Sequence, residues 1–377
     1  MRKSSWLLVL ILLFSPLVMA RTQGTYELIN QSIEIDTLTV TGPVYIVNST
    51  ITLTNPELSF IQIEAYSYSV VIQNSTISYN GSGVSYLAIN RGFVSIENLT
   101  LNKIGSRYKV NQIYRPQSIC VDGLFINNSR GSTMFKEASG EINNIKITNV
   151  DPYSNNVLLF QGGSPRVKNV DYTIPYMKVS AFTVIAVEAT RSIVLDNVNG
   201  VGKVNVHSPH FHVLCTGVDK YPALGVVIQN SSFFGGGNGA CTGWDITYLN
   251  CTFTSCTDGT EVFHPGKTVI IDTDFVSCTD SAINLQNGAL FDFIRCNFTD
   301  NQYPVNIANG VANLVNCTFS DGAKMFNLGN NKDTLEPVGV LNQYWIFPEK
   351  TVKFVSTYSE NRDVTLCYAG ELRLVYP

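Results

Sequence analysis

Short stretches of alternating apolar and polar residues run through most of the chain, and turn-forming residues separate them. The stretch from Ile72 to Tyr79 is rich in Ile, Thr and Tyr with a period of two, which is typical of a β-strand. Clusters of Asn, Gly and Ser at residues 80–83 and 235–239 are typical of turns. No window of 11–18 residues has the 3.6-residue period of an amphipathic helix. The pattern predicts an all-β chain.

A repeated element is plain in the last third of the chain. Four phenylalanines, Phe253, Phe275, Phe298 and Phe319, lie 22, 23 and 21 residues apart. Three of them follow an Asn-Cys-Thr or Arg-Cys-Asn triplet, and the fourth follows Asp-Thr-Asp. A fixed period of this length indicates one structural unit for each repeat.

The same element recurs in a degraded form in the first half. Its positions there are Asn48-Ser-Thr-Ile51, Asn74-Ser-Thr-Ile77, Asn98-Leu-Thr-Leu101, Gly123-Leu-Phe-Ile126, Asn144-Ile-Lys-Ile147 and Asn169-Val-Asp-Tyr172. A unit of 20–26 residues cannot bury its apolar face alone, so neighbouring units must stack. We therefore expect an all-β, right-handed parallel β-helix of roughly a dozen coils. A pair of β-sandwiches or a propeller is the alternative, and either would require antiparallel hairpins at 8–12-residue spacing.

Strand alternation assigns directions to the side chains of the repeat. Each phenylalanine must point into the core, so the residue two positions earlier shares its face and the residue three positions earlier points outward. Cys251, Cys296 and Cys317 are therefore expected inside, in register with Thr273. The asparagines expected to face solvent are Asn48, Asn74, Asn98, Asn230, Asn250 and Asn316.

Nine cysteines in a secreted chain suggest some disulfides, with at least one thiol left over. Cys256 and Cys278 occupy the same turn of consecutive coils, and the ~4.8 Å between stacked coils suits a disulfide. We predict a Cys256–Cys278 bridge first and a Cys296–Cys317 bridge second. Buried free thiols packed as small apolar groups are the alternative.

The two ends of the chain depart from the repeat. Arg2 and Lys3 precede an apolar run over residues 6–14, and Pro16 and Ala20 follow it. This layout predicts a cleaved signal peptide at residues 1–20, with a signal anchor as the alternative. Residues 21–337 form the expected β-helix with its N-terminal cap. Residues 338–377, with strands expected at 341–347 and 351–355, are predicted to cap the open edge.

Composition narrows the classes of function. Charged residues make up 14% of the chain and the net charge is −4 with no basic run, which argues against a nucleic-acid-binding surface. No second apolar segment is long enough to span a membrane. We expect a secreted, extracellular protein without a cofactor. The expected partner is extracellular polysaccharide or further copies of the chain.

Two short motifs carry a family resemblance. Phe125-Ile-Asn-Asn128 and Phe298-Thr-Asp-Asn301 match a Phe-x-x-Asn element, and Asn287-Gly-Ala-Leu290 is a degraded Gly-Gly-Ala-aliphatic element. Residues 44–330 thus resemble the right-handed parallel β-helix proteins of the pectin-lyase-like superfamily and, more weakly, the repeats of polymorphic outer-membrane proteins. The resemblance implies a fold, not an activity, because this fold carries lyases, hydrolases, adhesins and structural proteins.

Ten Asn-x-Ser/Thr sequons occur in the chain, and six of their asparagines take the outward register. They are Asn30, Asn48, Asn74, Asn80, Asn98, Asn127, Asn230, Asn250, Asn297 and Asn316. This placement predicts N-glycosylation, although Asn-x-Thr at a strand entry is a structural alternative.

Candidate chemistry is sparse. Asp272, Asp274 and Asp280 come closest to a carboxylate cluster for acid–base work, and His210 and His212 could share a face and bind a metal. The motif strings of the family's hydrolases (Asn-Thr-Asp, Asp-Asp, Gly-His-Gly and Arg-Ile-Lys) do not occur. We therefore expect a structural or adhesive role in an extracellular coat, wall or matrix. A polysaccharide lyase or glycoside hydrolase of acidic polysaccharide, or a non-catalytic carbohydrate-binding protein, is the alternative.

Overall fold

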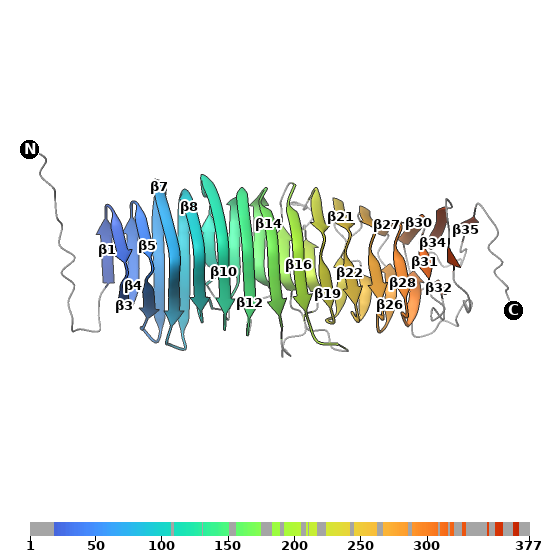
Figure 1. Ribbon diagram of the computed structural model, residues 1–377, viewed down its shortest axis with the longest axis horizontal. Coiled ribbons are helices and arrows are strands. Elements are labelled where there is room, and N and C mark those ends of the chain that lie inside the picture. Colours follow the sequence, from blue (N-terminus) through green and yellow to red (C-terminus); the bar gives the residue numbers. More distant parts are fainter. Residues whose placement is uncertain are drawn as a thin grey trace, which may run out of the picture.

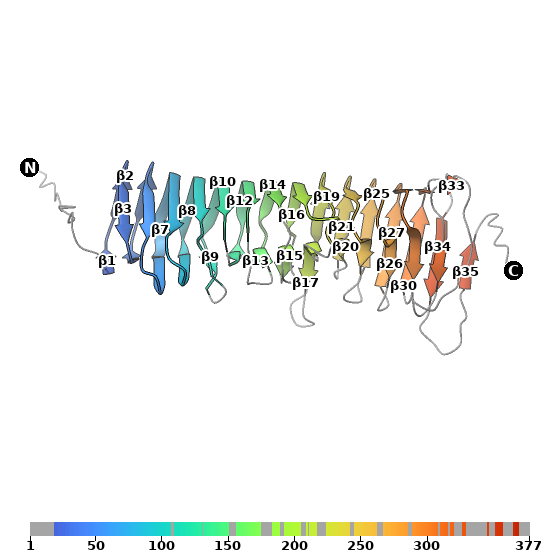
Figure 2. The ribbon, with the colours of Figure 1, turned by 90° about the horizontal axis from the view of Figure 1, so that it is seen from below.

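The chain forms one long stack of β-strands, with β1 and β35 at opposite ends of its long axis (Figures 1 and 2). The computed structural model describes residues 19–106, 109–129, 131–150, 156–174, 183–188, 192–204, 209, 211–216, 224–241, 245–261, 267–285, 289–307, 310–315, 317–319, 326–328, 345–346, 351–356 and 365–368. Within these ranges the structure has strands and turns and contains no α-helix, so the all-β prediction is confirmed.

The strands fall into three parallel ladders, which form three faces of a β-solenoid. The first face comprises β1 (Met19–Gln23), β4 (Thr37–Thr41), the starts of β7 (Leu58–Tyr79) and β8 (Val84–Asn102), β9 (Asn111–Tyr114), β11 (Thr133–Ala138), β13 (Asn156–Gly163), β15 (Thr183–Glu188), β17 (Phe211–Thr216), β20 (Asn238–Cys241), β23 (Asp258–Glu261), β26 (Ser281–Leu285), β29 (Tyr303–Ile307) and β32 (Phe326–Leu328).

The second and third faces share several long strands. The second comprises β2 (Tyr26–Ile29), β5 (Val44–Val47), the middles of β7 and β8, the starts of β10 (Ser118–Asn127), β12 (Gly140–Thr148), β14 (Arg166–Thr173) and β16 (Val194–Val201), β18 (Val226–Gln229), β21 (Asp245–Leu249), β24 (Lys267–Ile271), β27 (Ala289–Ile294) and β30 (Gly310–Val315). The third comprises β3 (Ser32–Ile35), β6 (Thr50–Leu53), the ends of those long strands, β19 (Ser232–Phe234), β22 (Thr252–Thr254), β25 (Asp274–Val276), β28 (Asn297–Thr299) and β31 (Thr318–Phe319).

The core follows from residue-for-residue pairing of each coil with the next. On the third face the pairing places Phe233, Phe253, Phe275 and Phe298 in one column, where all four side chains are buried. Successive ring centroids lie 5.2, 5.3 and 5.1 Å apart, and the rings are stacked. The inward direction predicted for Phe253, Phe275 and Phe298 is confirmed and is shared by Phe233, whereas the side chain of Phe319 lies outside the described part of the chain.

One glycine interrupts this column. Gly200 pairs with Tyr172 on one side and with Phe233 on the other. A Cβ added at Gly200 would lie 2.2 Å from the Tyr172 hydroxyl oxygen, so the buried tyrosine takes up the space of a side chain on the next coil. The column therefore continues across Gly200, because one large residue fills two levels of the core.

A column of asparagines forms the corner between the second and third faces. Asn74, Asn98, Asn230 and Asn250 have φ between 46° and 52°, a left-handed conformation that asparagine tolerates better than most residues. Their amides form rungs between coils, with Nδ2 to Oδ1 distances of 3.0 Å from Asn98 to Asn74 and 2.9 Å from Asn250 to Asn230. These four side chains and that of Asn48 are exposed, as predicted, whereas Asn316 lies outside the described residues.

The last three described strands pair in antiparallel fashion, unlike the coils before them. β34 (Thr351–Ser356) pairs with β30, β33 (Trp345–Ile346) pairs with β31, and β35 (Thr365–Tyr368) pairs with β34. The capping role of residues 338–377 stays a prediction, because most of that segment lies outside the described residues. The signal peptide also stays a prediction, since only its last two positions, Met19 and Ala20, are described, within β1.

The stacked phenylalanines should carry a large part of the local stability. Phe275→Ala removes a fully buried ring that stacks on two others, so we expect a loss of roughly 3–5 kcal/mol in the free energy of unfolding, measured by chemical denaturation. Phe234→Ala is the matched control, because that ring is 41% exposed on the adjacent column. Equal losses of unfolding free energy in the two variants would contradict the inward direction of the phenylalanine column.

Candidate functional site

The corner between the first and second faces gathers aromatic and cationic side chains. Tyr66 on β7 pairs with Arg91 on β8, and Arg115 and Glu137 take the corresponding places on the next two coils. All four have φ between 49° and 63°, and their side chains are exposed at the bend. We define the tyrosine–arginine corner as Tyr66, Tyr68, Arg91, Phe93, Arg115 and Gln117.

Local irregularities in the strands shape this corner. The pairing of β7 with β8 shifts register on both sides of Tyr66, and such bulges redirect side chains. Gly92 has a φ of 80°, and a Cβ there would lie 2.5 Å from the Ala65 Cβ and 2.7 Å from the Tyr68 carbonyl oxygen. Only glycine therefore lets the two coils approach this closely, which brings the side chains on either side of Gly92 against β7.

Three aromatic rings of the corner are exposed. Tyr66, Tyr68 and Phe93 are each 48% exposed, and they lie on adjacent coils, with Phe93 paired to Ser69. Scattered exposed hydrophobic residues are normal on a protein surface, but a group of them beside charged residues is typical of a binding site. Tyr66 and Phe93 stand on paired strand residues, so their backbone is already ordered before a ligand binds.

The two arginines of the corner differ in whether a carboxylate pairs with them. The Arg91 guanidinium lies 5.6 Å from the centroid of the Tyr66 ring, and no carboxylate pairs with it among the described residues. Arg115 Nε lies 2.6 Å from Glu137 Oε2, and its guanidinium lies 5.0 Å from the Tyr114 ring centroid. The hydrogen bond from Arg115 lowers the pKa of Glu137, so this carboxylate stays charged into the acid range.

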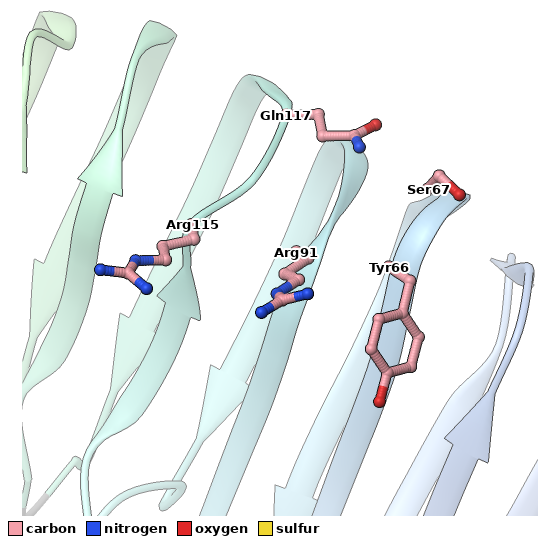
Figure 3. Close-up of a pocket in the computed structure, with 5 residues that line it drawn as sticks. All are labelled: Tyr66, Ser67, Arg91, Arg115 and Gln117. Carbon is pink, nitrogen blue, oxygen red and sulfur yellow. The ribbon is translucent and has the colours of Figure 1, made fainter.

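An open depression of about 360 Å³ lies at the corner, lined by Tyr66, Ser67, Arg91, Arg115 and Gln117 (Figure 3). A guanidinium presents a planar fork of N–H donors that matches a carboxylate or sulfate group. Exposed rings beside it offer apolar faces for the C–H groups of a ligand. The arrangement therefore suits a ligand that carries both an anionic group and an apolar face.

The acidic candidates predicted from the sequence connect neighbouring coils. Asp272 forms a bidentate pair with Arg295, with Nε–Oδ1 and Nη2–Oδ2 distances of 2.6 and 2.7 Å, and this pairing lowers the pKa of the carboxyl. Asp274 accepts a hydrogen bond from Asn297 Nδ2 at 2.7 Å. Asp280 lies in the bend before β26, where its N–H donates to the carbonyl of Thr257. Asp272 thus continues the asparagine corner, and Asp274 continues the neighbouring column of the third face.

The histidine candidate occupies the core. His212 is fully buried, with Nδ1 2.7 Å from the Tyr172 hydroxyl and Nε2 2.7 Å from the Gly235 carbonyl oxygen. Burial lowers its pKa to about 4, so the ring is neutral at physiological pH. Both nitrogens are engaged, which leaves His212 as a structural residue, and His210 lies outside the described residues. No group of three or more His, Cys, Asp or Glu residues that could hold a metal occurs in the described ranges.

The cysteines of the last third are buried in register, as predicted. Cys251, Cys296 and Cys317 lie inside with Thr273, and all are buried. The predicted Cys256–Cys278 and Cys296–Cys317 bridges are absent from this structure, in which all four residues are free thiols. The Sγ atoms of Cys296 and Cys317 lie 3.4–3.6 Å from backbone carbonyl oxygens, and burial raises the pKa of Cys256 to about 12. The raised pKa keeps the Cys256 thiol protonated, and a protonated thiol reacts slowly in disulfide exchange.

Sequence reasoning missed the tyrosine–arginine corner, although a signal for it exists. Tyr66, Arg91 and Arg115 lie 25 and 24 residues apart, which is the period of the coils. A search for exposed residue types at the coil period, not only for core residues, would have brought them together.

In comparisons with known proteins, no family model, no curated protein and no solved structure matches the chain. Among the described residues there is also no helix with the length and apolar character needed to cross a membrane.

The buried His212 predicts an acid-sensitive stability. Its folded pKa of about 4 lies below the unfolded value of 6.5, so its contribution is fully present above pH 6.5 and is lost as the pH falls toward 4. The loss is roughly 3 kcal/mol across that window. Denaturation of wild type and His212→Gln at several pH values checks this. The variant should be less stable at pH 7 and should lack most of the change between pH 6.5 and 4; an unchanged slope would refute the assignment.

Proposed function

We propose that the chain is a secreted β-solenoid with a structural or adhesive role in an extracellular coat, wall or matrix, where it binds acidic polysaccharide. One observation carries the proposal: exposed rings and a guanidinium without a carboxylate partner lie together on adjacent coils of a regular stack. The site is the tyrosine–arginine corner.

The chemistry of the corner favours an acidic sugar over other anionic ligands. A sugar ring has an apolar C–H face that packs on Tyr68 or Phe93, while its carboxylate or sulfate group pairs with Arg91. An anionic membrane surface would need a larger cluster of basic side chains than the two arginines of this corner. An extended peptide would need a free sheet edge, and each inner strand of this stack is paired on both sides.

A binding role is also favoured over catalysis by the places of the acidic candidates. Asp272 and Asp274 lie in columns whose polar side chains bond from coil to coil, and the oxygens of Asp272 are engaged by Arg295. A general acid or base needs a free proton-transfer position beside the substrate. The tyrosine–arginine corner instead offers rings and guanidinium groups, which bind and orient a ligand.

Secretion and N-glycosylation belong to the same proposal. Of the ten sequon asparagines, Asn127 is half-buried, Asn316 lies outside the described residues, and the other eight are exposed. Each amide nitrogen carries two hydrogens, so a glycan can replace one while the other keeps the bond to the preceding coil. The asparagine corner also contains Asn144, Asn169 and Asn197, which are not in sequons, so the corner itself favours asparagine.

The first test measures polysaccharide binding. Wild type should bind polygalacturonate and not neutral dextran, and Arg91→Ala should weaken binding about two- to fivefold, because an exposed charge-assisted pair is lost. Arg166→Ala is the matched control, since this exposed arginine lies on the second face, 4.0 Å from Glu141. Isothermal titration and affinity electrophoresis provide the affinities.

Three results would contradict this proposal. If wild type binds neither polygalacturonate nor dextran, the proposed binding role is wrong. Equal losses in Arg91→Ala and Arg166→Ala would reject the corner as the site. Release of new reducing or unsaturated ends from polygalacturonate would show turnover and would favour a lyase or hydrolase.

Mass spectrometry of the protein recovered from the medium of a eukaryotic expression host tests the processing. We expect a chain that begins at Arg21 and loses discrete glycan masses on treatment with an N-glycanase. An intact N-terminus, or a mass that the N-glycanase leaves unchanged, would contradict cleavage or glycosylation respectively.

A further inference from the structure

We propose that Glu137 competes with the ligand for Arg115. The tyrosine–arginine corner then presents one guanidinium without a carboxylate partner, that of Arg91, and one that is already paired, that of Arg115. The inference rests on the proposed function, because it concerns the same site. It goes beyond that function by assigning the corner a selectivity for the density of anionic groups along a polymer.

The two arginines are equivalent in position but differ in their partners. Arg91 and Arg115 occupy the same corner of consecutive coils, which stack ~4.8 Å apart. Arg91 rests on the ring of Tyr66 without a carboxylate, whereas Arg115 is held by Glu137 from the following coil. In Figure 3 the guanidinium of Arg115 points away from Arg91, toward the later coils.

The pairing is of a kind that a ligand can displace. The side chains of Arg115 and Glu137 are 51% and 41% exposed, so water and salt screen their attraction. An exposed pair of this type shifts an equilibrium by at most about fivefold. Glu137 therefore raises the ligand concentration needed to occupy Arg115 and does not block the site.

Tyr114 keeps the released guanidinium close to the corner. Its ring centroid lies 5.0 Å from the Arg115 guanidinium and 5.5 Å from the ammonium of Lys136. When an anionic group replaces Glu137, Arg115 can turn about this ring without leaving the surface. A sugar with one isolated charge would use Arg91 alone, while neighbouring charged sugars would engage both arginines.

The test compares Glu137→Gln with wild type in binding to polygalacturonate at low salt. The variant should bind about two- to fivefold more tightly, because the competitor for Arg115 is gone. The double variant Glu137→Gln with Arg115→Ala should lose that gain. Binding of monomeric galacturonate, which carries one charge, should be almost the same in wild type and Glu137→Gln.

Asp272→Asn is the matched control. Asp272 pairs with Arg295 at the same 2.6 Å, with side-chain exposures of 43% and 55%, but on a distant part of the stack. It removes the same charge and frees an arginine outside the corner, so it should leave the affinity unchanged. Circular dichroism checks that all variants remain folded.

The outcomes separate the two proposals. An affinity of Glu137→Gln equal to or weaker than that of wild type overturns the competition by Glu137, as does an equal gain in Asp272→Asn. The Arg91→Ala result would still support the corner as the site. A gain that survives the Arg115→Ala substitution also overturns the competition by Glu137. Absence of binding by wild type and by Glu137→Gln overturns both proposals.

Discussion

Residue-for-residue parallel pairing between consecutive coils is the constraint on which the rest of the structure depends. Each backbone hydrogen bond to the next coil fixes not only a strand but the place of every side chain along it. A residue repeated at the coil period therefore becomes a column: phenylalanines inside, asparagines at one corner, and tyrosine and arginines at another. The fold and the candidate site are products of the same register.

The two corners show how one backbone requirement serves different purposes. The asparagine corner has a left-handed residue in nearly every coil, and the tyrosine–arginine corner has one in four consecutive coils, at Tyr66, Arg91, Arg115 and Glu137. This conformation costs free energy for most residue types. At the asparagine corner, Asn98 and Asn250 offset this cost by bonding to the coil before them. At the tyrosine–arginine corner, Tyr66 and Arg91 have no comparable bond between their polar groups, and their side chains remain exposed. Strain kept without local compensation is a common property of functional surfaces.

The sequence predicted what depends on one residue type repeated at one period. Phe253 and Phe275 gave the core direction, and Asn74 and Asn98 gave the outward corner, because strand alternation converts spacing into direction. The disulfides could not be predicted in the same way. Stacked cysteines satisfy the distance for a bridge, but in this structure the thiols lie against carbonyl oxygens inside the core.

Other features escaped prediction because they depend on contacts between different residue types. His212 was expected to share a strand face with His210, yet it lies in the core between Tyr172 and Gly235, which are distant in the sequence. The tyrosine–arginine corner escaped because successive coils place Tyr, Arg, Arg and Glu there. The most direct test of the account is a crystal structure of the protein with a short oligogalacturonate. The account predicts a carboxylate within hydrogen-bonding distance of Arg91, with the sugar against Tyr68 or Phe93. An oligosaccharide bound on another face, with the corner empty, would contradict it.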